Sequence, residues 1–210
     1  MSTIQAQEGE LPSGYLPEVA AARHADAPVH PLVLNRWSPR AYEPRPVLEE
    51  QLATVLEAAR WAPSSSNLQP WRFYVARSPE EHETFRKFIK PNNRLWTDGA
   101  PVLLLIASEK RRDDGEPNGA HAFDAGAAWG ILALQAQLVG LSTRAVGGFD
   151  RALAREILAT PESIELHAVI ALGYRAAADR LPEALREREK PNGRRKIADV
   201  VLPVPRSSLG

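Results

Sequence analysis

The chain has 210 residues, enough for one sizeable domain, and its Lys plus Arg and Asp plus Glu counts are both 26, so its formal charge is zero. A neutral chain offers no bulk electrostatic field for nucleic acid or an anionic membrane. The absence of cysteine excludes disulfides, thiolate nucleophiles and cysteine-bound metals; it leaves the redox compartment open but suits the cytosol. No stretch resembles a signal peptide or approaches the roughly 20 apolar residues of a membrane span, so we expect a soluble, cytoplasmic protein.

The N-terminal residues 1–30 are polar, Ala-rich and interrupted by Pro, with little periodicity. We expect an arm there, either packed on a partner subunit or disordered, followed by a single domain over residues 31–210. Residues 31–35 predict a short helix that leads into Arg36-Trp37-Ser38-Pro39-Arg40. Because Arg36, Ser38 and Arg40 alternate, an extended chain would place their side chains on one face.

A helix is predicted over residues 48–61. Its apolar side chains form one stripe: Leu48, Leu52, Val55, Leu56 and Ala59. Pro63 ends this helix, because Pro disfavours helical geometry in the residue before it. Residues 63–69 then place three serines, an Asn and a Gln before a strand predicted over residues 72–76. A polar loop in such a connection often contacts ligands; the alternative is a loop whose side chains satisfy only their own backbone.

The rest of the chain alternates helices and strands. We expect a helix beginning at Ser78-Pro79, an irregular segment over 91–96, a central buried strand over 102–107, a charged loop over 110–119 and a long helix with small side chains over 120–141. A strand over 142–146, a helix from Asp150 to Leu158, a strand over 166–172 and a short strand over 200–202 complete the pattern. About four strands alternating with four helices indicate an α/β or α+β protein. No G-x-G-x-x-G follows a strand, which argues against a dinucleotide-binding fold of the usual kind.

Two basic clusters lie near the ends of the domain, Arg36-x-Ser38-x-Arg40 and Arg194-Arg195-Lys196. If the fold brings them together, arginine forks and a serine hydroxyl can bind a dianionic phosphate; solvated surface arginines are the alternative. The side chains of Asn67 and Gln69 can pair with a planar heterocycle. The glycines of Gly147-Gly148 can bring backbone N–H groups close to a ligand, or can simply form a turn.

Other catalytic patterns are weak. The five histidines show no metal-ligand spacing, and His167 lies in an apolar strand, where a satisfied core histidine is expected. No Ser-His-acid order or phosphate-binding P-loop is present, so we assign neither a metal site nor a catalytic residue. Trp71, Trp96 and Trp129 are interpreted as packing residues.

Several of these motifs together resemble the FMN-dependent nitroreductase family. The resemblance runs from Arg36-x-Ser38-x-Arg40 through Ala62-Pro63-Ser64-Ser65-Ser66-Asn67-Leu68-Gln69-Pro70-Trp71 to Gly140-Leu141-Ser142-Thr143, Val146-Gly147-Gly148-Phe149-Asp150, Leu172-Gly173-Tyr174 and Arg194-Arg195-Lys196. It covers roughly residues 32–202 in the family's order, and no single motif is highly specific.

The resemblance implies an α+β fold with a central, mostly antiparallel sheet flanked by helices, in an intertwined homodimer that holds two FMN molecules at the subunit interface. It places Arg36, Ser38 and Arg40 on the phosphate and pyrimidine side of FMN, and it places Arg194 and Arg195 against the FMN phosphate. It also brings Pro63, Ser64, Ser65, Asn67 and Gln69 to the flavin from the opposite subunit, and sets Gly147 and Gly148 beside the flavin ring.

The sequence departs from some relatives in three places. Gly147 stands where some have Glu, Trp37 stands where a basic residue or His is common, and no Lys occurs over residues 93–96, where Asn93 is our candidate for a ring contact.

The resemblance further implies a reaction in which NADH or NADPH delivers a hydride to flavin N5 and a nitroaromatic, quinone or similar acceptor is then reduced. The protein would supply position, charge and exclusion of water, and a cation such as Arg40 would favour the reduced flavin, which is anionic near N1. A flavin-storage protein without turnover, a flavin-dependent dehydrogenase or dehalogenase of the same fold, and a structural dimer that has lost FMN are the alternatives.

Overall fold

Four strands form one antiparallel sheet in the computed structural model, which describes residues 14–204. The strands β1 (Trp71–Ala76), β2 (Val102–Glu109), β3 (Ser142–Val146) and β4 (Ile164–Gly173) lie in the order β1-β2-β4-β3. Each neighbouring pair is antiparallel, and each connection in the chain contains at least one helix. The predicted α+β class with a central antiparallel sheet is therefore confirmed.

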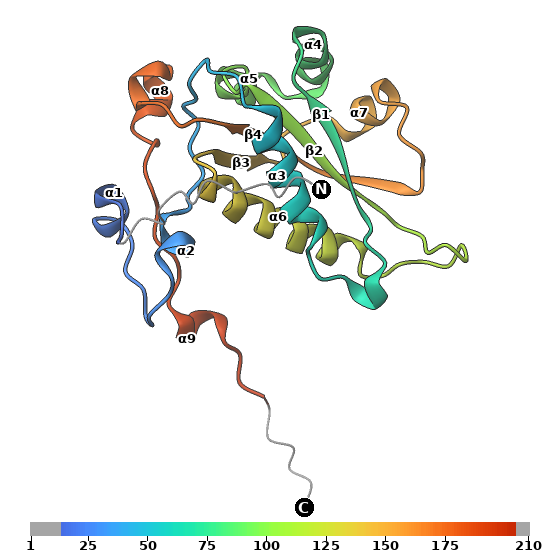
Figure 1. Cartoon of the computed structure of the whole chain (residues 1–210), viewed down its shortest axis with the longest axis horizontal. Coiled ribbons are helices and arrows are strands. Elements are labelled where there is room, and N and C mark those ends of the chain that lie inside the picture. Colours follow the sequence, from blue (N-terminus) through green and yellow to red (C-terminus); the bar gives the residue numbers. More distant parts are fainter. Residues whose placement is uncertain (1–13, 205–210) are drawn as a thin grey trace, which may run out of the picture.

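Helices cover both faces of the sheet (Figure 1). On one face lie α3 (Glu49–Arg60) and α6 (His121–Leu138), and on the other lie α4 (Pro79–Phe88), α5 (Pro91–Thr97) and α7 (Arg151–Ile157). The side chains of β2 alternate between the two cores, so that Leu103 and Leu105 pack with α4 while Leu104 packs with α3 and α6. This alternation explains why the apolar run is buried on both faces, as expected of a central strand.

Local sequence signals set several helix ends where they were predicted. The Ser78 hydroxyl accepts a hydrogen bond from the Glu81 N–H at 3.2 Å, and the Glu81 carboxylate accepts from the Ser78 N–H at 2.9 Å, which makes a capping box for α4. Asp150 caps α7 by accepting from the Leu153 N–H at 3.0 Å. At the end of α6, Gly140 adopts a φ of +77°, a left-handed geometry that favours glycine.

The apolar stripe predicted for α3 is correct except at its first residue. Leu52, Val55 and Ala59 are at most 3% exposed, and Leu56 is partly buried. Leu48 was predicted to be buried, but it is the N-cap residue and is 58% exposed. Its backbone is extended there, so the side chain leaves the helical stripe.

Two other predictions about local structure are wrong. Residues 91–96 are not irregular, because α5 begins with Pro91 at its first turn and is fixed by the burial of Trp96 and Thr97. Residues 200–202 do not form a strand. Instead, a short helix, α9 (Ile197–Val200), ends there, and Val201 and Leu202 are exposed.

The described part of the N-terminal arm packs on the domain. Within it, α1 (Pro17–Ala20) buries Val19. The Leu16 N–H of the arm donates at 2.9 Å to the side chain of Asn35, which is buried at the end of α2 (Pro31–Asn35) in the domain. Residues 1–13 of the predicted arm lie outside the described residues.

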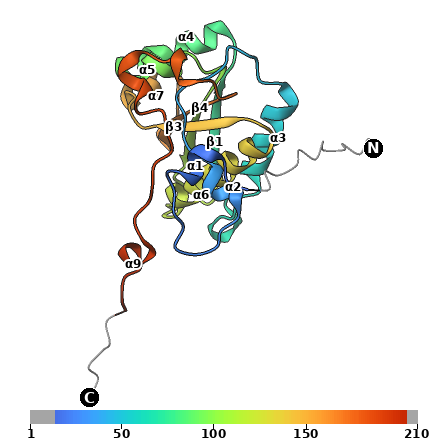
Figure 2. The ribbon, with the colours of Figure 1, turned by 90° about the vertical axis from the view of Figure 1, so that its left-hand side faces the viewer.

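The C-terminal segment contains η2 (Ala178–Arg180), α8 (Glu183–Arg186) and α9, and its last part leads away from the sheet in both views (Figures 1 and 2). A set of large apolar side chains on it is exposed by 51% or more: Ile197, Val200, Val201, Leu202 and Val204. Over residues 14–204, the helices are too short or too polar to cross a membrane.

Candidate cofactor-binding site

The segment Arg36 to Arg40 follows α2 and faces β3. The Arg36 guanidinium lies 3.3 Å from the Ser38 hydroxyl, so these two predicted phosphate ligands point into the same space. Arg40 is held differently. Its N–H donates to Glu189 at 2.7 Å, and its guanidinium lies 3.8 Å from the second oxygen of the same carboxylate.

The two predicted basic clusters approach each other through Arg36 and Arg194. Burial lowers the pKa of Arg36 from its ordinary value, and the neighbouring charge of Arg194 lowers it further. Arg23, which the sequence analysis did not select, donates to the carbonyl oxygens of Arg36 at 2.9 Å and Asn192 at 3.0 Å, and so ties the two segments together. Residues 14–204 provide no hydrogen-bond partner for the side chain of Arg195. The space around Arg36 is therefore crowded with cations.

Arg36 also lines a hollow of about 310 Å³ beside the C-terminal end of α6. Residues from that helix and the turn after it contribute to the wall: Ala133, Gln137, Gly140 and Leu141. This places the phosphate-ligand candidates at the end of α6 where the helix meets β3.

Asn93 and Gly148 meet at the connection between β3 and α7. The Asn93 amide donates to the Gly148 carbonyl oxygen at 2.9 Å. A Cβ atom added at Gly148 would lie 2.1 Å from the Asn93 Nδ2 atom, so a side chain there would displace the amide. At Gly147, by contrast, an added Cβ would meet nothing within 4 Å, and the residue is exposed. The backbone beside Asn93 is thus open to a planar ligand.

Arg144 of β3 links these two groups of residues. Its Nη1 atom donates to the Ser38 carbonyl oxygen, and its guanidinium lies 5.4 Å from the centre of the Trp96 ring on α5. The residue is half-buried. It was not predicted to belong to the site, because a lone arginine in a strand carries no motif. We call Arg23, Arg36, Ser38, Arg144, Arg194, Asn93, Gly147 and Gly148 the arginine end of the molecule.

Pro63 to Gln69 form a tight loop around η1 (Ser65–Asn67). Ser66, Asn67 and Gln69 have φ values of 50°, 56° and 47°, which are unusual for residues other than glycine. Two polar side chains of the loop form hydrogen bonds within the loop itself. The Ser64 hydroxyl accepts from the Gln69 N–H at 3.0 Å, and the Gln69 side chain donates to the Asn67 carbonyl oxygen at 3.2 Å. The amide of Asn67 is exposed and makes no hydrogen bond to the described residues.

A buried carboxylate anchors this loop to α6. Asp124 is 3% exposed, and it accepts a hydrogen bond from the Ser65 N–H at 3.1 Å. Backbone strain of this kind persists only where surrounding contacts fix it, and it is concentrated at functional sites. We call Pro63–Gln69 with Asp124 the loop end of the molecule.

The arginine end and the loop end lie at opposite ends of α6. Asp124 is in the first turn of this helix, and Gln137 is in its last turn beside Arg36. A rise of 1.5 Å per residue separates these positions by about 20 Å. The described chain therefore brings Arg36, Ser38 and Arg194 together at one end of α6 and does not bring the loop to them. Asn93 and Gly148 lie beyond the last residue of β3, whose first residue, Ser142, lines the Arg36 hollow.

A pair of histidines lies near the loop end, His121 at the start of α6 and His167 in β4. The Ser108 hydroxyl lies 2.8 Å from His121 Nδ1 and 2.6 Å from His167 Nε2, so His167 is the satisfied residue that the sequence predicted. Burial lowers the pKa of His167. Across residues 14–204, three or more His, Asp or Glu side chains do not gather into a metal-binding group.

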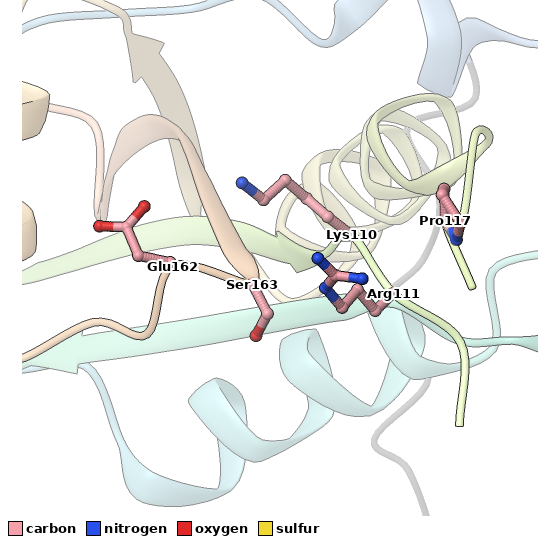
Figure 3. Close-up of a pocket in the computed structure, with 5 residues that line it drawn as sticks. All are labelled: Lys110, Arg111, Pro117, Glu162 and Ser163. Atoms are coloured by element: carbon pink, nitrogen blue, oxygen red, sulfur yellow. The ribbon is translucent and has the colours of Figure 1, made fainter. Parts of the chain in front are cut away.

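A separate surface hollow of about 370 Å³ lies between the charged loop after β2 and the turn before β4 (Figure 3). Its walls are Lys110, Arg111, Pro117, Glu162 and Ser163, none of which was predicted to bind a cofactor.

Comparison with known proteins gives a consistent result. The family model described as the nitroreductase family matches residues 33–94 and 83–174, which is more than half of the chain. An NADH dehydrogenase of Thermus thermophilus is 31% identical over 175 residues, covering 68% of this chain and 84% of that relative.

Solved structures agree. A crystal structure described as an oxidoreductase containing FMN is 40% identical, has a TM-score of 0.82 and covers 86% of this chain and 93% of its own. A nitroreductase family protein from Clostridium difficile 630 is 27% identical, with a TM-score of 0.64 and coverage of 81% and 95%.

Proposed function

The chain belongs to the nitroreductase family, and we propose that it is an FMN-dependent oxidoreductase that takes electrons from NADH or NADPH and reduces a nitroaromatic, a quinone or a similar acceptor. The observation that carries this proposal is the convergence of Arg36, Ser38 and Arg194 at one end of α6, while Asn93 contacts Gly148 beyond the other end of β3. Support also comes from the FMN-containing structure and from the name of the Thermus relative.

The residues at the arginine end fit FMN in chemistry. Two arginines and a hydroxyl are donors suited to a phosphate dianion. The Asn93 amide nitrogen donates to the Gly148 carbonyl, which leaves the amide oxygen and the second N–H for a ring contact. Gly147 leaves its backbone uncovered, so a flat ring can approach it without meeting a side chain. When bound, FMN supplies the redox chemistry, and the protein contributes position, charge and exclusion of water.

We further propose that a second copy of the chain completes the site with Pro63, Ser64, Ser65, Asn67 and Gln69. The separation of about 20 Å along α6 argues against one copy bringing the loop to its own phosphate-ligand candidates. Trp61 and Phe123 near the loop are 72% and 83% exposed, and Gly126 and Gly130 leave an open strip along α6. Apolar surface of this kind favours association. A folded, FMN-saturated monomer in sedimentation at low concentration would contradict the homodimer.

The decisive experiment mixes the FMN-loaded protein with NADH or NADPH without oxygen. Loss of the yellow flavin colour, followed by its return when a nitroaromatic or a quinone is added, supports the oxidoreductase. Colour that persists with both donors supports a flavin-storage protein instead. Free FMN with the same donors is the control for reduction without protein.

A further inference from the structure

The described part of the N-terminal arm, residues 14–30, reaches both segments that carry the phosphate-ligand candidates. It precedes residue 33, where the match to the family model begins. Both views place α1 and α2 beside the chain that leads into α9 (Figures 1 and 2). What this arm does is therefore a property of this chain that the matched part of the family does not explain.

One side chain of the arm holds the two basic segments together. The Arg23 Nη1 atom donates to the carbonyl oxygens of Leu34 and, at 2.9 Å, of Arg36, while its Nε atom donates to the Asn192 carbonyl oxygen at 3.0 Å. Each of these carbonyls lies within two residues of Arg36 or Arg194. A guanidinium presents its N–H groups in a fixed planar fork, so these bonds set the spacing between the two segments.

A second arm residue holds the other side of the C-terminal basic cluster. The Asp26 carboxylate accepts a hydrogen bond from the Ile197 N–H at 2.8 Å. Asn192 and Ile197 flank the cluster Arg194-Arg195-Lys196 on its two sides. Arg23 and Asp26 therefore fix the backbone of the whole cluster relative to Arg36.

The attached arm also brings a third cation to this place. Burial lowers the pKa of Arg23, and the charges of Arg194 and Arg36 lower it further. The pKa of Arg36 is lowered by burial and then by the charge of Arg194. Within residues 14–204, no carboxylate oxygen lies within ion-pair distance of these three guanidinium groups. Repulsion among partly desolvated cations opposes attachment of the arm, and an anion among them removes that repulsion.

We propose that the arm positions Arg36 and Arg194 for the FMN phosphate through Arg23, and that phosphate binding in turn strengthens the attachment of the arm. This inference rests on the proposed function. A ligand that binds best when the arm is attached shifts the arm toward that state. The coupling is reciprocal, so a change that releases the arm weakens phosphate binding by the same factor. Arg23 is thus a positioning residue that acts on the ligand through Arg36 and Arg194.

The first test compares FMN with riboflavin, which has the same ring and ribityl chain but no phosphate. Both ligands are titrated into the parent protein and into Arg23→Gln, each freed of FMN. We expect the FMN affinity of the variant to fall at least about tenfold, while its riboflavin affinity stays within about threefold of the parent. Equal losses for the two ligands would reduce Arg23 to general support of the fold and overturn the proposal, as would parent-like FMN binding.

The second test reads the arm itself by hydrogen exchange. The Ala20 N–H donates to the Leu16 carbonyl and the Arg23 N–H to the Val19 carbonyl, both at 2.9 Å, so these amides report on α1. FMN and a high concentration of inorganic phosphate should slow their exchange at least about threefold in the parent and much less in Arg23→Gln, whereas riboflavin should not slow it. Exchange that FMN leaves unchanged in the parent would overturn the coupling.

Glu18→Gln is the matched control. Glu18 also joins the arm to the domain, through an ion pair with Arg175 at 2.7 Å, and both side chains are 37% exposed. An exposed ion pair contributes little, so the FMN affinity should stay within about threefold of the parent. A loss equal to that of Arg23→Gln would overturn the proposal, because any loosening of the arm would then explain the result.

Arg23→Lys keeps the charge but lacks the planar fork, and it decides the matter if Arg23→Gln does not fold. One ammonium group cannot hold three carbonyls at the spacing that a guanidinium does, so FMN affinity should fall at least about fivefold. Parent-like FMN binding in Arg23→Lys would show that charge alone suffices and would overturn the positioning role. A parent protein that binds no FMN would refute the proposed function and this inference with it, whereas FMN binding that is equal in the parent and in the Arg23 variants refutes this inference alone.

Discussion

The arginine end and the loop end differ in how the chain builds them. The arginine end gathers residues from Arg23 to Arg194 and crowds their charges into partly desolvated space. The loop end is one continuous segment, and three of its residues hold positive φ angles. Charge at the first end selects an anionic ligand, whereas a fixed backbone at the second presents an exposed amide in one orientation. The comparison suggests that neither end is a complete site alone.

The largest loss of FMN affinity is expected from removing the arginines that we place at the FMN phosphate. Arg36→Ala and Arg194→Ala should each weaken FMN binding by about 1.5–3 kcal/mol, roughly 10- to 150-fold, because each removes a charge-assisted contact. Titration of the apoprotein with FMN measures this loss.

Arg195→Ala, one residue along, tests which cation of the C-terminal cluster matters. The sequence placed both Arg194 and Arg195 at the phosphate, whereas the structure brings the charge of Arg194 to Arg36. We expect a smaller loss for Arg195→Ala. Parent-like binding in both Arg36→Ala and Arg194→Ala would show that the arginine end is not a phosphate site.

A somewhat smaller effect is expected at the loop end. Asn67→Ala should weaken FMN binding by about 1–3 kcal/mol, because a polar group of a largely buried ring loses its partner. Asn67 has a φ of 56°, so Asn67→Gly is the control that removes the amide without adding backbone strain. Equal losses in the two variants assign the effect to the amide; parent-like binding of Asn67→Gly would assign it to backbone strain.

The two ends also differ in how far the sequence revealed them. Contiguous motifs were enough to predict the loop, the Arg36-x-Ser38-x-Arg40 segment and the Gly147-Gly148 pair as candidate site segments. The reason is that the alternation of side chains along an extended chain and the residue preferences of turns both act over a few residues. Helix ends at Ser78, Asp150 and Gly140 were predictable for the same reason.

The contributions of Arg23 and Arg144 were not predictable from local pattern. Arg23 lies in a segment without periodicity, and Arg144 is a single cation in a strand, so only the folded chain shows that each contacts the Arg36–Ser38 backbone. The separation of the two ends likewise depends on the packing of α6, which no motif encodes.

The glycine pair tests the shape of the arginine end. Gly148→Ala should lower the free energy of unfolding by about 1–2 kcal/mol, because the new Cβ displaces the Asn93 amide and its hydrogen bond. Gly147→Ala, where an added Cβ meets nothing within 4 Å, should change it by less than about 0.5 kcal/mol. Urea titration measures both. Equal values for the two variants would contradict the close packing of Asn93.

The smallest effect is expected from pH and concerns the loop end. The pKa of His167 is lowered, chiefly by burial. Glu165 raises this pKa, whereas His121 and Arg151 lower it further. The stabilising contribution of neutral His167 is therefore complete above the ordinary histidine pKa of about 6.5 and is lost as pH falls through the lowered value. His167→Gln should flatten this fall, measured by urea titration between about pH 7 and 5. The exposed His24 is the control, and an equal change in His24→Gln would contradict the assignment.

We expect the two ends to meet on one flavin across a subunit interface. A mixed dimer tests this, with Arg36→Ala in one copy and Asn67→Ala in the other. If contacts are made between copies, one site holds both defects and the other is intact, so FMN titration should show one tight and one very weak site. Two equal, moderately weakened sites would mean that each copy binds its own flavin with both ends, and would contradict the claim.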